Sequence, residues 1–584
     1  MAGLVAQFWE RRVWRVLIAW PSMAFVLLQA IEFFINNYDL DARFLTAGMI
    51  AAIGTFPAGI VWNWRHGEAG KQPFSLAEVS TYVIFGVATL MAAAWYWRVT
   101  PAQHDFMDRQ STAARSVIVL PFENVNGDEE LGYLTEGIAE SLINWMSGLP
   151  DIRVVAKSAA FRFAGTPVEI AALRREFDVD SALRGELEVQ GENLVISASF
   201  VNLLDQSQIW GERFVRPLDE VIYLERSIVA ALTDSLQLQL SDDERAPAAS
   251  GSTDNPEAYR RYLRGHHLIQ ATDLESISQG LDELRAAIRL DPKFGQPYAD
   301  IADALSQMIF YGIYDDPALM GEARNAAYSA VALAPELPES HTALATMHQY
   351  LTFDWAAVDE AYRTAIALGP QSPAPYHRYA DFLWVTLQFE KAREMATRAI
   401  EIDPLDGSSM HAVGIVELFS GNFEAAVAAF AEWNKFHPES RWSYVKHAIA
   451  LSMNGQCDES ANQIAAVEQL TGGRMSNLMH GWIAWAHRAC GRDAEYAGKR
   501  DQILAVAAQN PERIDPTLIG LYMAEGQPDK AIDLLERMIE VRHPTMMFVQ
   551  INFLDHMGTP GAAEIHRDPR FMALLRELDF PAPN

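Results

Sequence analysis

The sequence lacks the short motifs that mark most catalytic and nucleotide-binding sites. It contains no Walker loop, no GxGxxG after a strand, no HExxH and no nucleophile elbow. GEAGK, at residues 67–71, has too few residues between its glycines to cradle a phosphate. The histidine pairs His266–His267 and His480–His487 lack a carboxylate or thiolate at metal-binding spacing. We therefore expect no enzyme, no cofactor and no metal site.

Positive charge is also scarce. The 46 Lys and Arg residues face 76 Asp and Glu residues, which gives a formal net charge of -30. Such a surface repels phosphate backbones and anionic lipid head groups, so we expect no nucleic-acid partner. Solubility alone would explain the acidity equally well.

Long apolar runs, in contrast, are present near the amino terminus: the first has an uncharged core at 16–31 flanked by Arg15 and Glu32, and the other two carry no charge. Three segments, at about 13–35, 44–64 and 79–97, each reach the roughly 20 residues that a helix needs to cross a bilayer. Arg and Lys precede the first segment and lie between the second and third, which places the amino terminus in the cytoplasm. We expect residues 1–98 to form a multi-pass domain of a bacterial inner membrane, with the C-terminal domains periplasmic. Buried helices of a soluble protein are the alternative interpretation.

After a linker at 99–114, residues 115–240 show the pattern of a compact α/β domain. Strands are expected at 116–122 and 152–156, followed by three alternating antiparallel strands between 181 and 216, with a hairpin turn at Gly191-Glu192. Helices are expected at 134–149, 168–177 and 220–240. The order β-α-β-α-β-β-β-α indicates an α/β sandwich.

This region resembles a known family. LPFENVNGDEELGYLTEGIAESLINWMSGL, then ALRGELEV and QIWGERF, are similar to the TolB-like amino-terminal domain that often precedes tetratricopeptide repeats in bacterial membrane proteins. In relatives the leader position can hold a winged-helix or nucleotide cyclase domain, and neither is recognised here. Ala159-Ala160 stands where family members often carry Ser or Thr, which weakens the case for a polar ligand site in that loop.

A second linker, 241–255, leads to a repeating region at 256–545. Pro335, Pro370, Pro404 and Pro438 are spaced by 35, 34 and 34 residues, which is the tetratricopeptide period. Seven or eight helix pairs are expected to stack into a solenoid, with an insertion around 310–317 and a capping segment at 546–584. The expected fold is therefore α-helical overall: three transmembrane helices, a small α/β domain and a tetratricopeptide solenoid.

Stacked helix pairs form a concave groove, and we expect it to bind a protein or peptide. The residues expected to line it are His377, Asp381, Trp384, His411 and Trp442. The two tryptophans fit the core between repeats equally well. The sequence thus predicts a membrane-anchored periplasmic scaffold, which could form a homo-oligomer. The alternative is a transmembrane receptor whose α/β domain binds a small molecule.

The two cysteines, Cys457 and Cys490, both lie late in the repeats. Cys457 is expected at the start of the second helix of one repeat, and Cys490 at the end of the first helix of the following repeat. Because consecutive helices run antiparallel, these two helix ends lie side by side. An oxidising periplasm would join them in a disulfide. Two unrelated small core residues are the alternative.

Overall fold

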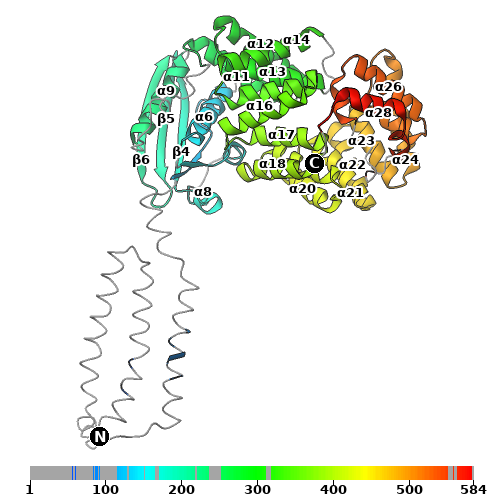
Figure 1. The fold of residues 1–584 in the computed structure, drawn as a ribbon. Helices are drawn as coiled ribbons and strands as arrows, with labels where there is room; N and C mark the ends of the chain where they lie inside the picture. The colour runs from blue at the N-terminus through cyan, green and yellow to red at the C-terminus, as the bar shows by residue number, and fades with distance from the viewer. Residues whose placement is uncertain are drawn as a thin grey trace, which may run out of the picture. The chain divides into compact units, whose positions relative to one another are not determined.

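The computed structural model describes residues 115–581, except 128–130, 150–151, 165–169, 218–219, 236–251, 272, 311–316, 550–556 and 558–561, together with seven residues before 98. The chain divides into two compact units, Met1–Ala114 and Arg115–Asn584. The second unit contains an α/β part and an array of helix pairs (Figure 1).

The α/β part is built around a sheet that has six strands in the described residues, with the order β3-β1-β4-β5-β6 and a short β2 beside β4. The strands are β1 (Arg115–Val119), β2 (Glu123–Asn124), β3 (Ile152–Val154), β4 (Ser181–Gln190), β5 (Asn193–Asn202) and β6 (Gln208–Pro217). The helices are α6 (Gly132–Ser147), α7 (Lys157–Phe161), α8 (Ile170–Phe177) and α9 (Val221–Ser235).

Most of these elements match the sequence-based prediction. β4 and β5 pair antiparallel from Ser181↔Asn202 to Gln190↔Asn193, and Gly191 takes a positive φ of 66° in the two-residue turn between them. Glycine is suited to this turn because it adopts positive φ without a steric cost. The prediction missed β2 and α7, which are too short to show a period.

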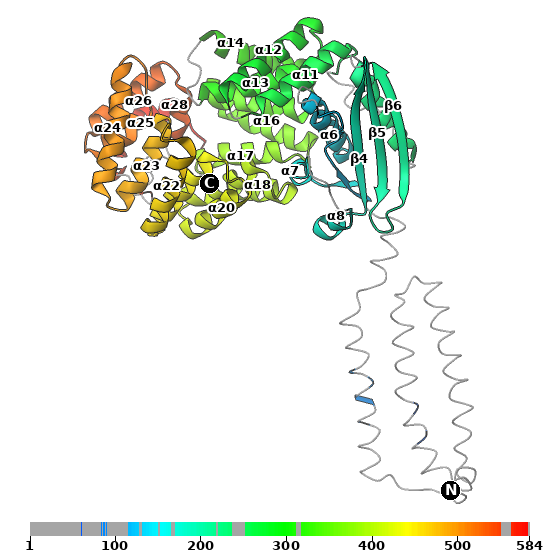
Figure 2. The ribbon, with the colours of Figure 1, turned by 180° about the vertical axis from the view of Figure 1, so that it is seen from behind.

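The α/β part and the first helix of the array share one hydrophobic core. Buried strand residues such as Leu183 and Ile196 belong to the same cluster as Tyr259 and Leu263 of α11 (Pro256–Ile269). Helix α6 lies between the sheet and the array in both views (Figures 1 and 2). The array therefore begins as a continuation of the sheet's core.

A charged cluster reinforces this junction. His266 of α11 lies with its Nδ1 2.7 Å from the Asp300 carboxylate and its Nε2 3.6 Å from the Glu140 carboxylate of α6. Lys157 of α7 forms a second ion pair with Glu140 at 2.6 Å. Although burial alone would lower it, the two carboxylates raise the pKa of His266 to about 10. The imidazole is therefore a cation that joins the sheet part to the array.

The described part of the array consists of eight antiparallel helix pairs. The first pair is α11 with α12 (Leu274–Leu290), and the others are α13 (Gln296–Phe310) with α14 (Pro317–Leu333), α15 (Pro338–Met347) with α16 (Trp355–Leu368), α17 (Pro373–Val385) with α18 (Phe389–Ile402), α19 (Gly407–Phe419) with α20 (Phe423–Phe436), α21 (Arg441–Met453) with α22 (Cys457–Thr471), α23 (Asn477–Ala489) with α24 (Asp493–Gln509) and α25 (Thr517–Ala524) with α26 (Pro528–Glu540). This architecture is a tetratricopeptide-like solenoid, as the period of the sequence predicts.

The first helices of successive pairs form the inner layer of the array. Successive first helices pack against one another: α13 on α15, α15 on α17, α17 on α19, and α21 on α23. In the described residues, successive second helices do not pack against one another to a similar extent. Small residues allow the close packing within each pair. A Cβ atom at Gly414 of α19 would lie 2.4 Å from Cε1 of Phe430 in α20, and Ala426 is fully buried beside it.

The end of the chain packs back onto the middle of the array. The 3₁₀ helix η4 (Pro544–Phe548) contacts the π-helix η3 (His348–Thr352) that continues α15. The Phe548 ring lies 5.5 Å from that of Phe310 and 5.7 Å from that of Trp384. Trp355 donates a hydrogen bond from Nε1 to the Leu578 carbonyl at 2.7 Å. The predicted capping helix is α28 (Pro569–Leu578). It packs against the last helix pair, and its final residue, Leu578, also contacts Trp355 in the middle of the array.

The predicted transmembrane helices are corrected. In the part of the chain that the structure describes, no helix has the length and apolar character required to cross a bilayer. The longest helices there, α12, α14 and α24, have 17 residues each, and a crossing needs about 20 apolar ones. The segments 13–35, 44–64 and 79–97 lie outside the described residues, apart from single positions in the last two. The fold class is therefore a mostly helical solenoid with an α/β part.

Candidate binding site on the inner layer of the repeat array

Four of the five residues predicted to line a groove gather around one lysine that the prediction omitted, Lys446 of α21. Asp381 and His411 interact with it electrostatically, and Trp442 lies beside it on the same helix. Trp384 joins the group through Asp381, to which its Nε1 donates a hydrogen bond at 3.3 Å. We call these residues, together with His377, Arg378 and Trp482, the inner-layer site, because they belong to the first helices α17, α19, α21 and α23.

Lys446 occupies an aromatic environment. Its Nζ lies 3.3 Å from the ring centroid of Trp482 and 5.7 Å from that of Trp442. The side chain is buried, with 9% of the residue exposed. Burial lowers the pKa of Lys446 to about 7, and Asp381 partly offsets this effect. The two indole faces favour the charged ammonium through cation–π attraction.

Asp381 is half-buried on α17. Burial raises its pKa to about 6, although Arg378, the Trp384 indole and Lys446 act in the opposite direction. A carboxylate in this position loses hydration that its neighbours only partly replace. Changing its charge would therefore affect folding as well as any binding.

The two histidines of the site are neutral near pH 7. Burial lowers the pKa of His377 to about 4 and that of His411 to about 3, and Lys446 contributes to the second shift. His411 packs against Trp433, with 5.4 Å between the ring centroids. Their positions on the inner layer agree with the register expected from the sequence, but their burial shows that they also pack in the core.

Arg378 brings a second cation to the site. It forms one long hydrogen bond, 3.5 Å from Nη2 to Asp303 Oδ2 of α13. Asp303 also accepts from Gln307 at 2.6 Å, while its Oδ1 is buried without a hydrogen-bond partner. The polar groups of this part of the inner layer are therefore incompletely satisfied, which is unusual for buried groups.

Aromatic rings surround the charged groups. Trp384 stacks on Phe419 of α19 at 4.7 Å, and Phe419 contacts Trp482 and Trp485 of α23 at 6.1 and 6.4 Å. Trp384 is 5% exposed, so it is part of the core between repeats, whereas Trp442 and Trp482 are half-buried. The two interpretations of the tryptophans are thus divided: Trp384 serves packing, and Trp442 remains available on the surface of the site.

Sequence reasoning missed Lys446, Arg378 and Trp482 for identifiable reasons. A lysine or arginine in a helix is usually solvated, so neither residue stood out in the pattern. A signal was nevertheless present: Lys446 lies one helical turn after Trp442, and residues four apart share a helical face. The approach of Trp482 from the next repeat could not be read from the sequence.

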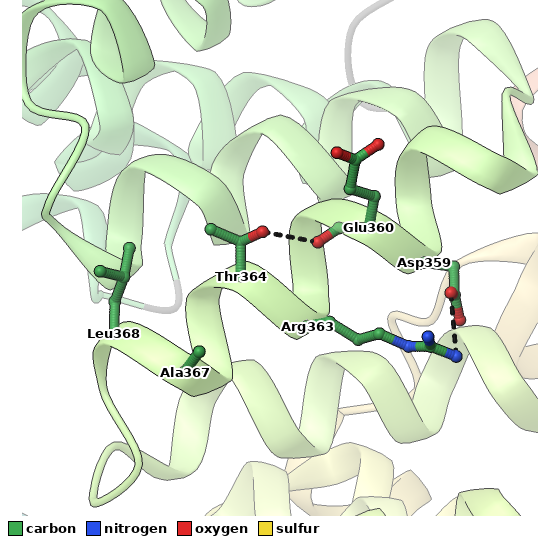
Figure 3. Close-up of a pocket in the computed structure, with 6 residues that line it drawn as sticks. All are labelled: Asp359, Glu360, Arg363, Thr364, Ala367 and Leu368. Atoms are coloured by element: carbon green, nitrogen blue, oxygen red, sulfur yellow. Dashed lines mark hydrogen bonds and ion pairs between the residues drawn. The ribbon is translucent and has the colours of Figure 1, made fainter.

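A surface hollow of about 450 Å³ lies elsewhere, on helix α16 (Figure 3). Its polar groups belong to one helix and bond to each other: Arg363 pairs with Asp359 at 3.1 Å, and Thr364 donates to the Glu360 carbonyl at 2.9 Å. All six lining residues belong to α16, and the Tyr379 hydroxyl of α17 bonds to Asp359 and Arg363, so these two side chains already have partners. This hollow is a poor candidate for a functional site.

The remaining sequence candidates lie apart from the inner-layer site. His266 serves the junction with α6, and His267 lies 3.3 Å from the Glu136 carboxylate. His480 and His487 are both buried on α23. Among the residues that the structure describes, no three His, Cys, Asp or Glu side chains are grouped to hold a metal ion.

The two cysteines are joined. Cys457 at the start of α22 and Cys490 at the end of α23 form a disulfide with a Cα–Cα distance of 5.6 Å. Arg492 donates to the Cys457 carbonyl at 2.9 Å and so ties the same two helix ends together. The disulfide joins α22, the helix that follows α21 and Trp442, to the end of α23, which carries Trp482.

Comparison with known proteins gives one related sequence and several solved structures. A protein of Rhizobium meliloti (strain 1021) described as "Putative adenylate cyclase 3" is 26% identical over 254 residues, which are 43% of this chain and 42% of that protein. The chain thus matches about two fifths of that relative's length. No family model matches the sequence.

This relative corrects one expectation. The lack of catalytic motifs led us to expect that the chain is not an enzyme, but the sequence that resembles it is described as a putative cyclase. Motif absence is weak evidence, because a motif search recognises only the chemistries whose motifs are known. The non-catalytic assignment therefore does not stand.

Solved structures with some likeness are helical-repeat proteins. Pseudomonas aeruginosa PilF is 17% identical and covers 37% of this chain and 95% of its own, with a TM-score of 0.28. PilW, a type IV pilus biogenesis factor, is 17% identical over 37% of this chain and 94% of its own, with a TM-score of 0.30. Yeast Tom70 is 15% identical over 56% of this chain and 69% of its own, with a TM-score of 0.35. At TM-scores below 0.5, these likenesses do not bear on the function of this chain.

Proposed function

We propose that this chain is a scaffold or adaptor that binds a protein or peptide partner through the inner-layer site of its repeat array. The observation that carries the proposal is the convergence of Trp442, Trp482, Lys446 and Arg378 from different repeats on one face. Tryptophan and arginine supply much of the binding energy in protein interfaces, and they do so when grouped at the centre of a contact. A helical-repeat array presents such a face over several repeats.

The α/β part adds a second element to this proposal. We assign it to the TolB-like type, on the sequence motifs quoted above and on the observed order of strands and helices. Because it shares a core with α11, it also holds the first repeat in a fixed position. In this scheme residues 115–240 orient the array, and residues 256–545 bind the partner.

The compartment is part of the proposal. A disulfide between Cys457 and Cys490 is compatible with an oxidising environment such as the bacterial periplasm, and reducing cytoplasm does not normally maintain such a bond. The C-terminal domains would then act outside the cytoplasm, where the partner would also be found.

Site-specific photo-crosslinking in living cells tests the proposed function. A photoreactive amino acid replaces Trp442, which is half-buried on the inner layer, and in a matched control it replaces Tyr328 of α14, which is 50% exposed on a second helix. We expect a discrete protein adduct from position 442 that is absent from position 328. Identical adduct patterns from both positions, or none from position 442 in a folded chain, would refute binding at the inner layer.

A further inference from the structure

Lys446 is a buried lysine, with 9% of the residue exposed, that brings an ammonium group to the inner-layer site when it is protonated. In the described part of the chain its ammonium has neither a hydrogen bond nor an ion pair, and its close contacts are the Trp442 and Trp482 rings. An ammonium group has three donors, and removing it from water without an acceptor is strongly unfavourable. Cation–π attraction to two indoles offsets only part of that cost.

In the described ranges, the neighbouring elements do not supply an acceptor for the Lys446 ammonium. Asp381 of α17 is the carboxylate that acts on Lys446 electrostatically, but it is not within ion-pair distance and its side chain accepts from Trp384. Asp303 of α13 is engaged by Arg378 and Gln307. From α19, His411 faces the same region as a neutral ring that offers no negative charge. Among the residues that the structure describes, the protonated Lys446 therefore has no carboxylate within ion-pair distance.

We propose that Lys446 is the docking point for an acidic side chain, Asp or Glu, of the protein partner, which enters between the Trp442 and Trp482 rings. A carboxylate would accept the ammonium's hydrogen bonds and form a charge-assisted pair in a partly desolvated position. This inference rests on the proposed function, because it names the chemistry of the group that the inner-layer site recognises.

The net charge of the chain restricts the partner further. At -30, the chain repels a partner segment that is acidic throughout. Screening confines that repulsion to about 8 Å at physiological salt, so a single carboxylate next to the lysine is attracted locally. The segment that fits is therefore one with an isolated Asp or Glu among apolar or basic residues.

A structural role for Lys446 makes the opposite prediction about stability. If the ammonium holds the repeats together, Lys446→Met lowers the stability of the free protein. If the lysine is kept for binding, the same substitution removes an unpaired buried charge, and methionine fills a similar volume. The full chain carrying Lys446→Met should then unfold at the same denaturant concentration as the wild type or at a higher one. Lys435→Met is the matched control, because Lys435 is exposed and already paired with Glu432.

Binding is measured on the full chain labelled with 5-fluorotryptophan, by the ¹⁹F resonances of Trp442 and Trp482. The probe is the blocked peptide acetyl-Ala-Ala-Glu-Ala-Ala-amide. Its Gln counterpart removes the charge, and the Gln peptide with a free carboxyl terminus moves the charge from a side chain to the chain end. We expect shifts with the Glu peptide, at least about tenfold weaker binding of both Gln peptides, and loss of the shifts in Lys446→Met but not in Lys435→Met.

Three results would overturn the inference: equal binding of the Glu and blocked Gln peptides, tighter binding of the free chain end, or a lower stability of Lys446→Met with unchanged peptide binding. The crosslinking experiment keeps this failure separate from that of the proposed function. If the partner is still captured at position 442 with the same yield in the Lys446→Met background, the scaffold function stands and the acidic docking point does not.

Discussion

The substitution Gly414→Ala tests the packing that makes the repeat region a solenoid. A Cβ atom at this position would lie 2.4 Å from Cε1 and 2.7 Å from Cδ1 of Phe430, far closer than carbon atoms approach in proteins. The Phe430 ring is fully buried. Overpacking of this kind costs about 1–3 kcal/mol, while replacing a helical glycine by alanine gains up to about 1 kcal/mol. We expect a net loss of about 1–2 kcal/mol of unfolding free energy.

Gly498→Ala provides the matched control. Gly498 also lies inside a helix, α24, but no atom lies within 4 Å of the position of its Cβ. The same chemical change should therefore stabilise the protein by about 0.5–1 kcal/mol through helix propensity alone. Denaturant unfolding of the full chain, followed by circular dichroism at 222 nm, compares the two variants. If Gly414→Ala were as stable as Gly498→Ala, helix α19 could not be as close to Phe430 as described. Phe430→Leu in the Gly414→Ala background should restore part of the loss.

Three further predictions concern charge and covalent links. His266→Gln should weaken the junction with α6, and the backbone amides of α6 and α11 should then exchange their hydrogens faster than in the wild type. The pKa of His266 is raised to about 10, so the charged imidazole stabilises the junction fully below its unfolded pKa of about 6.5, and this stabilisation is lost as the pH rises towards 10. Over that pH range the wild type, but not the variant, should therefore lose protection from hydrogen exchange at the junction. Asp381→Asn should raise the free energy of unfolding at pH 7.5, because the Asp381 carboxyl has a pKa of about 6 and its charged form, which dominates above that pH, is costly to bury. In urea titrations, the free energy of unfolding of the wild type should increase on acidification from pH 6 to 4, and that of the variant should increase less. Replacing both Cys457 and Cys490 by serine should cost about 4 kcal/mol in denaturant unfolding, as expected for closing a loop with a sequence separation of 33.

Each of these has an outcome that contradicts it. Unchanged exchange in α6 for His266→Gln would mean that the shared apolar core alone holds the junction. A less stable Asp381→Asn at pH 7.5 would show that its hydrogen bond from Trp384 outweighs the cost of burial. For the cysteines, equal stability of the serine variant and the oxidised protein would rule out a stabilising disulfide, and free thiols in protein taken from cells would argue against an oxidising compartment.

The sequence placed the candidate residues on particular helices of the repeats, and their role in binding stays a prediction. The helical register placed His377, Asp381, Trp384, His411 and Trp442 on first helices, and all five lie there. Their degree of burial could not be derived, because it depends on which neighbours from other repeats and from the C-terminal segment cover them. Phe548, for example, is 164 residues from Trp384 in the sequence and stacks 5.7 Å from it.

Local pattern determined much of this protein. The 34-residue period specified the helix pairs, the small residue Gly414 specified where two helices approach, and period-two alternation specified β4 and β5 with the turn at Gly191. These features depend on residues close in sequence, whose backbone geometry and apolar periodicity decide the outcome. Only the tertiary structure decided that the sheet and α11 share a core, that η4 returns to the middle of the array, and that Lys446 meets Trp482 from the next repeat. Such contacts arise from the curvature and closure of the stacked pairs, and curvature is the sum of small rotations that no single repeat encodes.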